Sequence, residues 1–400
     1  MASSARRGTS GQGAARFFRQ HRGRWPAGGC DGGFSRCACG PRLEPKPDAD
    51  PAPDPRIAFY VPALTHPMPL RAPPPLRALL GALLILCAAQ AMAACSGSDM
   101  RPRLTPSAEA RLEAEIARTP YAYGNHWVAS RDGRQIHVIG TMHTGDRRLG
   151  AVMRRLRPVI RSADAVLLEV TAHATDAELD QIMRDRSMFL LKEPPYLPDM
   201  LSEPVWDYLA ARMAEDGFKP EQVARMQPWF AGFFLDQSGC SGGPVPGQGL
   251  DDRIERVATR ARIPIGSLEP SGAGLEALAG QPIRDQAKIL EYDLTSEMNF
   301  DDQVVTMSEA YFDERLAEGM LIQDWTMYAD LGVPRSEVKR LLDGFQDRLI
   351  DARNRAWVPV IERTGGAVLV VAVGGAHLPG EDGLLNLLAR KGYVMERAPF

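Results

Sequence analysis

Residues 369–377 read LVVAVGGAH, an apolar and largely β-branched run that ends in glycine and is followed by a histidine. Residues 136–143 read IHVIGTMH and repeat this design, with Gly140 and His143 in the equivalent positions. Each run predicts a buried strand, and its glycine lets the backbone turn sharply as it leaves the sheet. Because open α/β sheets bind ligands beyond the carboxyl ends of their strands, we expect His143 and His377 at one edge of a sheet.

The rest of the pattern predicts an α/β fold. Residues 165–170 and 263–268 form two further strand-like runs, the first almost continuously apolar, as expected for a strand buried on both faces. Strands that alternate with helices predict a central, mostly parallel sheet with helices on both faces. A proline-containing region, residues 176–236, predicts a helical insertion. Helical periodicity also marks residues 107–118, 151–161, 253–262, 281–298, 304–318, 336–363 and 383–391.

The N-terminal residues have the layout of an export signal. Met68 opens a basic segment, followed by a short apolar core and by Met92-Ala93-Ala94-Cys95. These last four residues are similar to the site at which bacteria cleave and acylate a cysteine. We therefore expect a lipid anchor on Cys95, with plain secretion after cleavage near Ala94 and an uncleaved anchor as alternatives.

This layout divides the chain into four segments. The first is too rich in arginine, glycine and proline to bury a core, which predicts a disordered leader or a mis-assigned start. The expected segments are the leader 1–67, the signal peptide 68–95, a tether and short helix 96–120, and a folded domain 121–400.

Charge and cysteine content narrow the class of protein. The chain of 400 residues has a formal net charge of -3, which argues against a nucleic-acid-binding protein. Of its six cysteines only Cys240 lies in the expected domain, so we expect core packing alone to hold that domain.

Carboxylates end two of the other apolar runs. Glu169 closes the run that begins at Ala165, and Glu269 follows Leu268. Because an unpaired buried glutamate is costly, these positions indicate a cation nearby. His143, Glu169 and His377 predict a three-ligand metal site that keeps a position open for water. The alternative is that the histidines bond to backbone and the glutamates cap helices or pair with arginines.

Three more polar residues are candidates for the same site. Arg353 and Asn354 are adjacent in the helical segment 336–363, where they could polarise a carbonyl or hold a ligand, or could face solvent. Asp251 follows a glycine-rich segment and is either the N-cap of the next helix or a site residue.

Several blocks of the chain resemble the TraB/PrgY/GumN family. They are residues 140–145 (GTMHTG), 163–169 (ADAVLLE), 249–251 (GLD), Leu268-Glu269, Arg353-Asn354 and 373–385 (VGGAHLPGEDGLL). The resemblance runs from about Tyr121 to the C-terminus. It implies a metal-dependent hydrolase fold, with His143, Glu169 and His377 as metal ligands and Glu169 as ligand or general base. It also implies that Arg353, Asn354, Asp251 and Glu269 line the same cleft.

The expected function is therefore that of an exported hydrolase of peptide or ester bonds in the bacterial cell envelope, facing the periplasm. Manganese, cobalt and zinc all suit its mixed imidazole–carboxylate site. Two alternatives remain open. One is a non-catalytic protein that binds haem or another small ligand. The other is a scaffold in envelope polysaccharide assembly.

Overall fold

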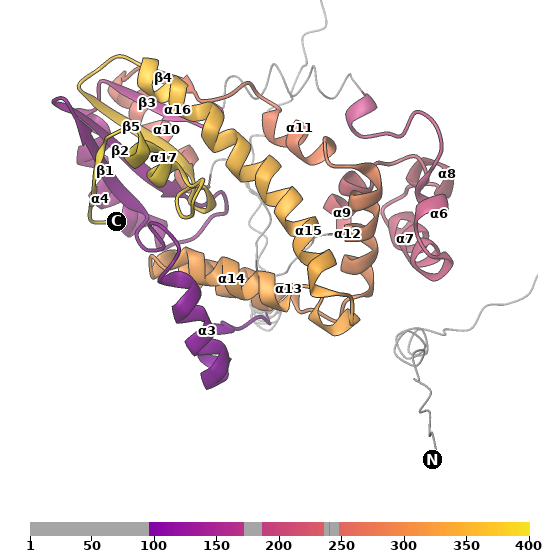
Figure 1. Ribbon diagram of the computed structural model, residues 1–400. Coiled ribbons are helices and arrows are strands. Elements are labelled where there is room, and N and C mark those ends of the chain that lie inside the picture. The colour runs from indigo at the N-terminus through magenta and orange to yellow at the C-terminus, as the bar shows by residue number, and fades with distance from the viewer. Residues whose placement is uncertain (1–95, 172–185, 236–239, 241–247) are drawn as a thin grey trace, which may run out of the picture. The chain divides into compact units, whose positions relative to one another are not determined.

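The computed structural model describes residues 96–171, 186–235, 240 and 248–400. All of them belong to one unit, Cys87–Phe400. The leader, the signal segment and Cys95 lie outside the described residues. Within the described part, the centre of the fold is a six-stranded sheet in the order β4-β3-β5-β2-β1-β6 (Figure 1). The strands are β1 (His126–Arg131), β2 (Arg134–Thr141), β3 (Ala165–Leu168), β4 (Ile265–Ser267), β5 (Val368–Gly374) and β6 (Val394–Arg397).

The four strands β4, β3, β5 and β2 run parallel. Beyond β2, β1 is antiparallel to β2, and β6 is antiparallel to β1. In the register, Thr141 at the end of β2 lies opposite Gly374 at the end of β5. On the other side of β5, Leu168 pairs with Ala372. The predicted mostly parallel sheet is confirmed, and the carboxyl ends of its central strands meet at one edge.

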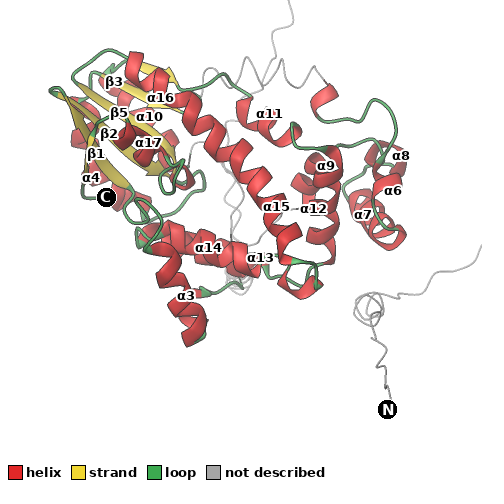
Figure 2. Cartoon of the chain, viewed as in Figure 1, coloured by secondary structure: helices red, strands yellow, loops and turns green. Residues whose placement is uncertain are grey.

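Helices cover both faces of the sheet, as predicted (Figure 2). One face packs on α4 (Leu149–Ser162) and α10 (Leu250–Ala261), whose fully buried residues include Leu156, Ile160 and Ile254. The other packs on α16 (Ala352–Arg363) and α17 (Leu384–Arg390), centred on the fully buried Trp357. Burial of each large apolar side chain contributes about 1.5–3 kcal/mol, so these two layers hold the strand ends firmly in place.

The predicted helical insertion lies between β3 and α10. Its described elements, of which α7 (Glu203–Glu215) is the longest, form a separate apolar cluster together with α12 (Ile283–Thr295). Prolines at the first helical positions explain why the region is broken into short helices rather than one long one. The elements are η2 (Arg186–Met188), α6 (Leu197–Met200), α7 (Glu203–Glu215), α8 (Pro220–Val223) and α9 (Pro228–Leu235).

The helix predicted at residues 304–318 is wrong, because the structure has two helices there. They are α13 (Phe300–Phe312) and α14 (Leu316–Thr326). Glu314 between them has a left-handed backbone, with φ of 58°, which ends the first helix. The break lets Tyr311 pack in the core beside α4 while Ile322 packs against α3 (Pro106–Ile116).

The segment predicted as one helix at residues 336–363 is nearly continuous. It comprises α15 (Arg335–Gln346), a π-helical segment (Asp347–Asp351) and α16, which together form the long diagonal helix of Figure 1. π-helical turns inside α-helices are frequent at functional sites, and Leu349 and Ile350 of this turn line the cavity described below. The remaining elements are η1 (Arg101–Arg103), α11 (Ala273–Ala279), η3 (Ala329–Leu331) and η5 (Gly375–His377).

Cys240 is disulfide-bonded, which corrects the expectation that core packing alone holds the domain. The other five cysteines all lie within residues 1–95, outside the described part of the chain. In the ranges that the structure describes, no helix has the length and apolar character needed to cross a membrane.

Candidate functional site

Four of the residues singled out in the sequence follow the carboxyl ends of four neighbouring parallel strands. His143 lies two residues beyond β2, and Glu169 directly follows β3. Glu269 lies two residues beyond β4, and His377 ends the short η5 turn after β5. The topology thus brings together four side chains that are far apart in the sequence.

His377 is buried and held on two sides. Its Nδ1 atom lies 2.8 Å from the Oδ1 atom of Asn354, and its ring lies 4.4 Å from that of Trp357, centroid to centroid. Burial lowers the pKa of His377 to about 4. The imidazole is therefore neutral near pH 7 and presents Nε2 toward Glu169, whose Oε1 atom is 4.0 Å away.

His143 differs from His377 in both exposure and charge. Its side chain is 61% exposed, and its Nδ1 atom lies 3.3 Å from the Oδ2 atom of Asp251. The hydrogen bond to Asp251 raises the pKa of His143 to about 9. The N-cap of α10 is Gly249, so the interpretation of Asp251 as a cap is wrong and its carboxylate serves His143 instead.

Both carboxylate oxygens of Glu169 are engaged. Oε1 accepts a hydrogen bond of 2.5 Å from the amide of Gly374, and Oε2 accepts one of 2.6 Å from Nη2 of Arg353. Burial would raise the pKa of Glu169, but its electrostatic interactions with His377, His143 and Arg353 and the hydrogen bond from the Gly374 amide hold it below its ordinary value. Glu169 is therefore an ionised, rigidly oriented acceptor.

Arg353 bridges the two glutamates. Its Nη2 atom lies 2.6 Å from an oxygen of Glu169 and 2.6 Å from an oxygen of Glu269, and Nε also donates to Glu269. Its Nη1 atom donates to the carbonyl of Leu349 and lies 3.4 Å from Nε2 of His377. The alternative in which the glutamates pair with an arginine is thus found in the structure, inside the same cluster as the histidines.

A gap beside Gly374 lies at the centre of the cluster. A Cβ atom placed on Gly374 would lie 3.2 Å from Oε1 of Glu169, 3.4 Å from Nε2 of His143 and 3.5 Å from Cδ2 of His377. Only glycine leaves this space open, so the three predicted ligands lie around the space beside Gly374. We call this gap the Gly374 cradle.

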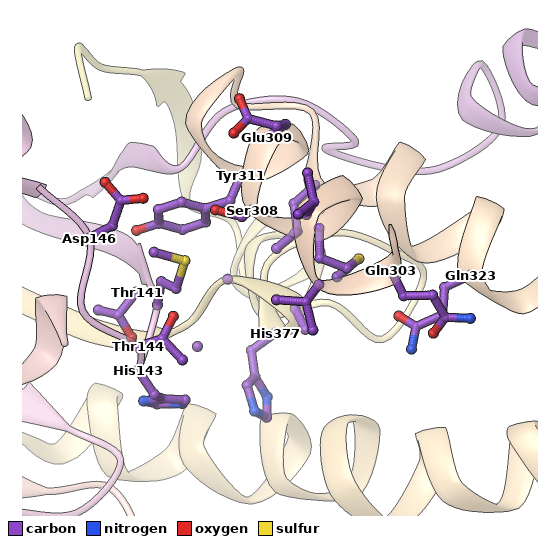
Figure 3. Close-up of a pocket in the computed structure, with 18 of the residues that line it drawn as sticks. Thr141, His143, Thr144, Asp146, Gln303, Ser308, Glu309, Tyr311, Gln323 and His377 are labelled. Atoms are coloured by element: carbon purple, nitrogen blue, oxygen red, sulfur yellow. The ribbon is translucent and has the colours of Figure 1, made fainter. Parts of the chain in front are cut away.

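The cradle opens into a cavity of about 720 Å³. Figure 3 shows His143 and His377 extending in the same direction at one end, with Ser308 and Glu309 of α13 at the other. A second cavity of about 360 Å³ lies on the other side of Glu169. Four residues line both cavities: Thr141, His143, Glu169 and Arg353.

Three residues at the site were missed in the sequence. Trp357 donates from Nε1 to Glu269 and packs against the ring of His377, and its position one turn after Arg353 could have revealed it. Thr141 is buried, and its hydroxyl has no hydrogen-bond partner in the described ranges. Gly374 appeared only as a turn residue. Asn354, predicted in the cleft, is fully buried behind His377 and contacts its imidazole and its carbonyl.

The donor set fits a divalent metal ion. Each histidine directs Nδ1 to an oxygen acceptor, an arrangement typical of histidine ligands. Nε2 of His143 lies at the cradle, and Nε2 of His377 lies beside Nη1 of Arg353. The cradle provides the space. Among the described residues, no three His, Cys, Asp or Glu side chains already stand at metal-binding spacing. The site therefore fits an ion by its chemistry, in a more open arrangement than a preformed site.

Fold and site together define a class: an α/β protein with a histidine–carboxylate cluster at the carboxyl edge of a parallel sheet. The chain belongs to the TraB/PrgY/gumN family, whose family model matches residues 125–397, and the resemblance noted in the sequence is confirmed. The chain is also 23% identical over 277 residues to the uncharacterized protein YbaP of Escherichia coli (strain K12), covering 66% of this chain and 94% of the relative. The YbaP protein of Shigella flexneri matches with the same identity and coverage.

Proposed function

We propose that the chain is a divalent-metal-dependent hydrolase of the bacterial cell envelope that cleaves peptide or ester bonds. The observation that carries the proposal is the Gly374 cradle, around which two imidazoles and an ionised carboxylate converge at the mouth of a large cavity. Such a combination suits activation of a water molecule next to a bound substrate.

His143, Glu169 and His377 would hold the ion, which when bound would supply a polarised water for attack on a carbonyl. Manganese, cobalt and zinc all accept this donor set. Because a ligating imidazole nitrogen must be unprotonated, His377 is ready to bind at neutral pH, whereas His143 must first release its proton.

The surrounding residues give each group a distinct task. The lowered pKa of Glu169 makes it a weak base, which favours the role of ligand over that of general base. Arg353 is held by Glu169 and Glu269, and its Nη1 atom lies nearest to His377. From there the guanidinium would stabilise an oxyanion developing beside the cradle.

The cavity supports a substrate with an apolar part next to the scissile bond. Met142, Val304 and Met307 line it, and methionine side chains adapt readily to different apolar shapes. Its far rim is polar, with Asp146 and Arg148 beside Glu309. A peptide or an ester with an apolar side group matches both features.

The test is metal content and turnover in the same samples. The metal-free chain is reconstituted with manganese, cobalt or zinc and assayed on peptide and ester substrates. We expect bound ion and turnover in the wild type, a sharp loss of both in His143→Ala and His377→Ala, and no change in His137→Asn. Equal metal content in all four proteins, or none in the wild type, contradicts the proposal. A haem Soret band without turnover would then favour the ligand-binding alternative, and neither signal would favour the polysaccharide scaffold.

The proposal also includes export and a lipid anchor on Cys95, placing the domain on the periplasmic side of a membrane. Its basis is the signal-like sequence of residues 68–95.

A further inference from the structure

Helix α4 carries an unusual set of charges. Its sequence, LGAVMRRLRPVIRS, contains four arginines and no acidic residue. The buried side of the helix packs on the sheet through Val152, Leu156 and Ile160. The arginines are therefore displayed on its outer side, although the whole chain has a net charge of -3.

Most of these arginines have no partner. Arg154, Arg157 and Arg161 are exposed, and their side chains form no hydrogen bond or ion pair within the described part of the chain. The same holds for Arg260 and Arg262 at the end of α10, which packs beside α4 (Figure 1). We call these five residues the arginine face.

Several exposed arginines elsewhere on the domain are paired, whereas the arginine face gathers five unpaired ones on two neighbouring helices. Arg355 contacts Asp347 and Asp382, and Arg340 contacts Asp285. Near the arginine face, the carboxylate of Asp164 is already used, because it accepts hydrogen bonds from the amides of residues 367 and 368. The positive charge of this face is thus less neutralised than that of the paired surface arginines.

The position of the arginine face leaves the candidate site free. α4 ends at Ser162 just before β3 begins, and α10 ends at Ala261 just before β4 begins. The C-terminal ends of both helices therefore lie at the amino edge of the parallel strands. His143 and His377 lie at the opposite, carboxyl edge, so a surface bound to the arginine face would not cover them.

We propose that the arginine face docks on a membrane surface rich in anionic phospholipid. Its arginines sit on the outer sides of two packed helices, and neither cavity described above is lined by them, which suits a broad charged surface better than a small anion. The signal-like segment of residues 68–95 would bring the domain to a membrane. The proposal does not depend on the hydrolytic chemistry, and each arginine near an anionic bilayer strengthens binding roughly fivefold.

The test is binding of the full chain to vesicles. Wild type and the triple variant Arg154→Gln/Arg157→Gln/Arg161→Gln are mixed with vesicles of phosphatidylcholine alone or with added phosphatidylglycerol, and bound protein is measured by sedimentation. We expect the triple variant to bind the anionic vesicles roughly 100-fold more weakly, with no difference on neutral vesicles. Wild-type binding should weaken as salt is added, because the contacts are screened.

A matched control removes the same charge from other places. Arg284, Arg335 and Arg363 are exposed and likewise form no ion pair in the described ranges. The triple variant Arg284→Gln/Arg335→Gln/Arg363→Gln should bind as the wild type does, and thermal unfolding followed by circular dichroism checks that both variants are folded. Equal loss in both triple variants, equal binding of wild type to both kinds of vesicle, or binding to heparin without binding to vesicles would each overturn the proposal.

Discussion

The Nδ1 atom of His377 lies 2.8 Å from the Oδ1 atom of Asn354, and this contact fixes which nitrogen of the imidazole faces the site. Both amide hydrogens of Asn354 are already donated, one to the carbonyl of His377 and one to that of Asp382. Oδ1 is therefore the acceptor, Nδ1 of His377 carries the proton, and Nε2 keeps its electron pair beside Glu169 and Arg353. Asn354 is thus a positioning residue that acts through His377.

Asn354→Ala should loosen His377 and leave its Nδ1 proton and two carbonyls unsatisfied. We expect metal affinity to fall by about 10–100-fold, as is typical when the partner of a histidine ligand is removed. The unpaired buried groups should lower the free energy of unfolding by about 1–3 kcal/mol. Titration calorimetry and urea denaturation measure the two effects. Asn386→Ala, which removes a surface asparagine bonded to Glu381, is the control. Unchanged affinity in Asn354→Ala would contradict the positioning role.

Gly374→Ala places a methyl group in the cradle. The backbone of Gly374, with φ of -50° and ψ of 137°, is open to alanine, so the free energy of unfolding should change by less than about 1 kcal/mol. The methyl group would nevertheless stand within 3.5 Å of His143, Glu169 and His377 and exclude an ion. We expect loss of bound metal and of turnover in a folded protein.

The control for this variant is Gly150→Ala in α4, where an added Cβ meets no atom within 4 Å. Alanine should there be neutral or stabilise the helix by roughly 0.5–1 kcal/mol, with metal content unchanged. Full metal content in Gly374→Ala would show that the ion binds at a place other than the cradle.

The strand-end positions of His143, Glu169, Glu269 and His377 could be predicted because they depend on local pattern. An apolar run followed by glycine or a carboxylate marks the end of a buried strand, and parallel strands share a carboxyl edge. The partners of these residues could not be predicted in the same way. The pairing of Asp251 with His143 depends on the distance in space between two elements, and the periodicity of the sequence carries no information about that distance. The break at Glu314 was missed for a similar reason, since packing of α14 against α3 forces a left-handed residue into a continuous helical pattern.

Arg353→Leu should be strongly destabilising, because it leaves Glu169 and Glu269 as uncompensated charges that are 17% and 8% exposed. We expect a loss of about 3 kcal/mol in the free energy of unfolding, and partial recovery in Arg353→Leu/Glu269→Leu. Arg355→Ala is the control. It removes a neighbouring arginine whose side chain is 45% exposed and should cost less than about 1 kcal/mol. Urea denaturation of wild type, Arg353→Leu, Glu269→Leu, the double variant and Arg355→Ala measures the coupling, and additive effects in the double variant would exclude it.

Processing of the N-terminus provides a separate prediction. If Cys95 is acylated, the mature protein should partition into detergent, and Cys95→Ser should release it or stall its cleavage. Mass spectrometry identifies the first residue of the mature protein and any acyl group on it. A mature chain that begins at or before Met68 would refute lipidation at Cys95.

The last prediction concerns pH and a histidine outside the site. His137 lies on β2, and its Nδ1 atom is 3.1 Å from Nε2 of His126. Burial, with a smaller contribution from His126, lowers the pKa of His137 from 6.5 to about 4. As the pH falls below about 6.5, His137 therefore becomes protonated in the unfolded chain, whereas in the folded protein it stays neutral until about pH 4. The contribution of neutral His137 to the free energy of unfolding is therefore full above pH 6.5 and is lost as the pH falls from 6.5 to 4.

His137→Asn keeps a polar atom near the position of Nδ1 but cannot titrate. Between pH 7 and pH 4.5 the wild type should lose up to about 2 kcal/mol more free energy of unfolding than the variant does. Urea denaturation at a series of pH values measures the difference. Parallel pH profiles for the two proteins would mean that His137 is protonated equally in the folded and unfolded states. The hydrogen bond between the two imidazoles would then have to hold with one ring charged, with Nδ1–H of the protonated His137 donating to Nε2 of His126.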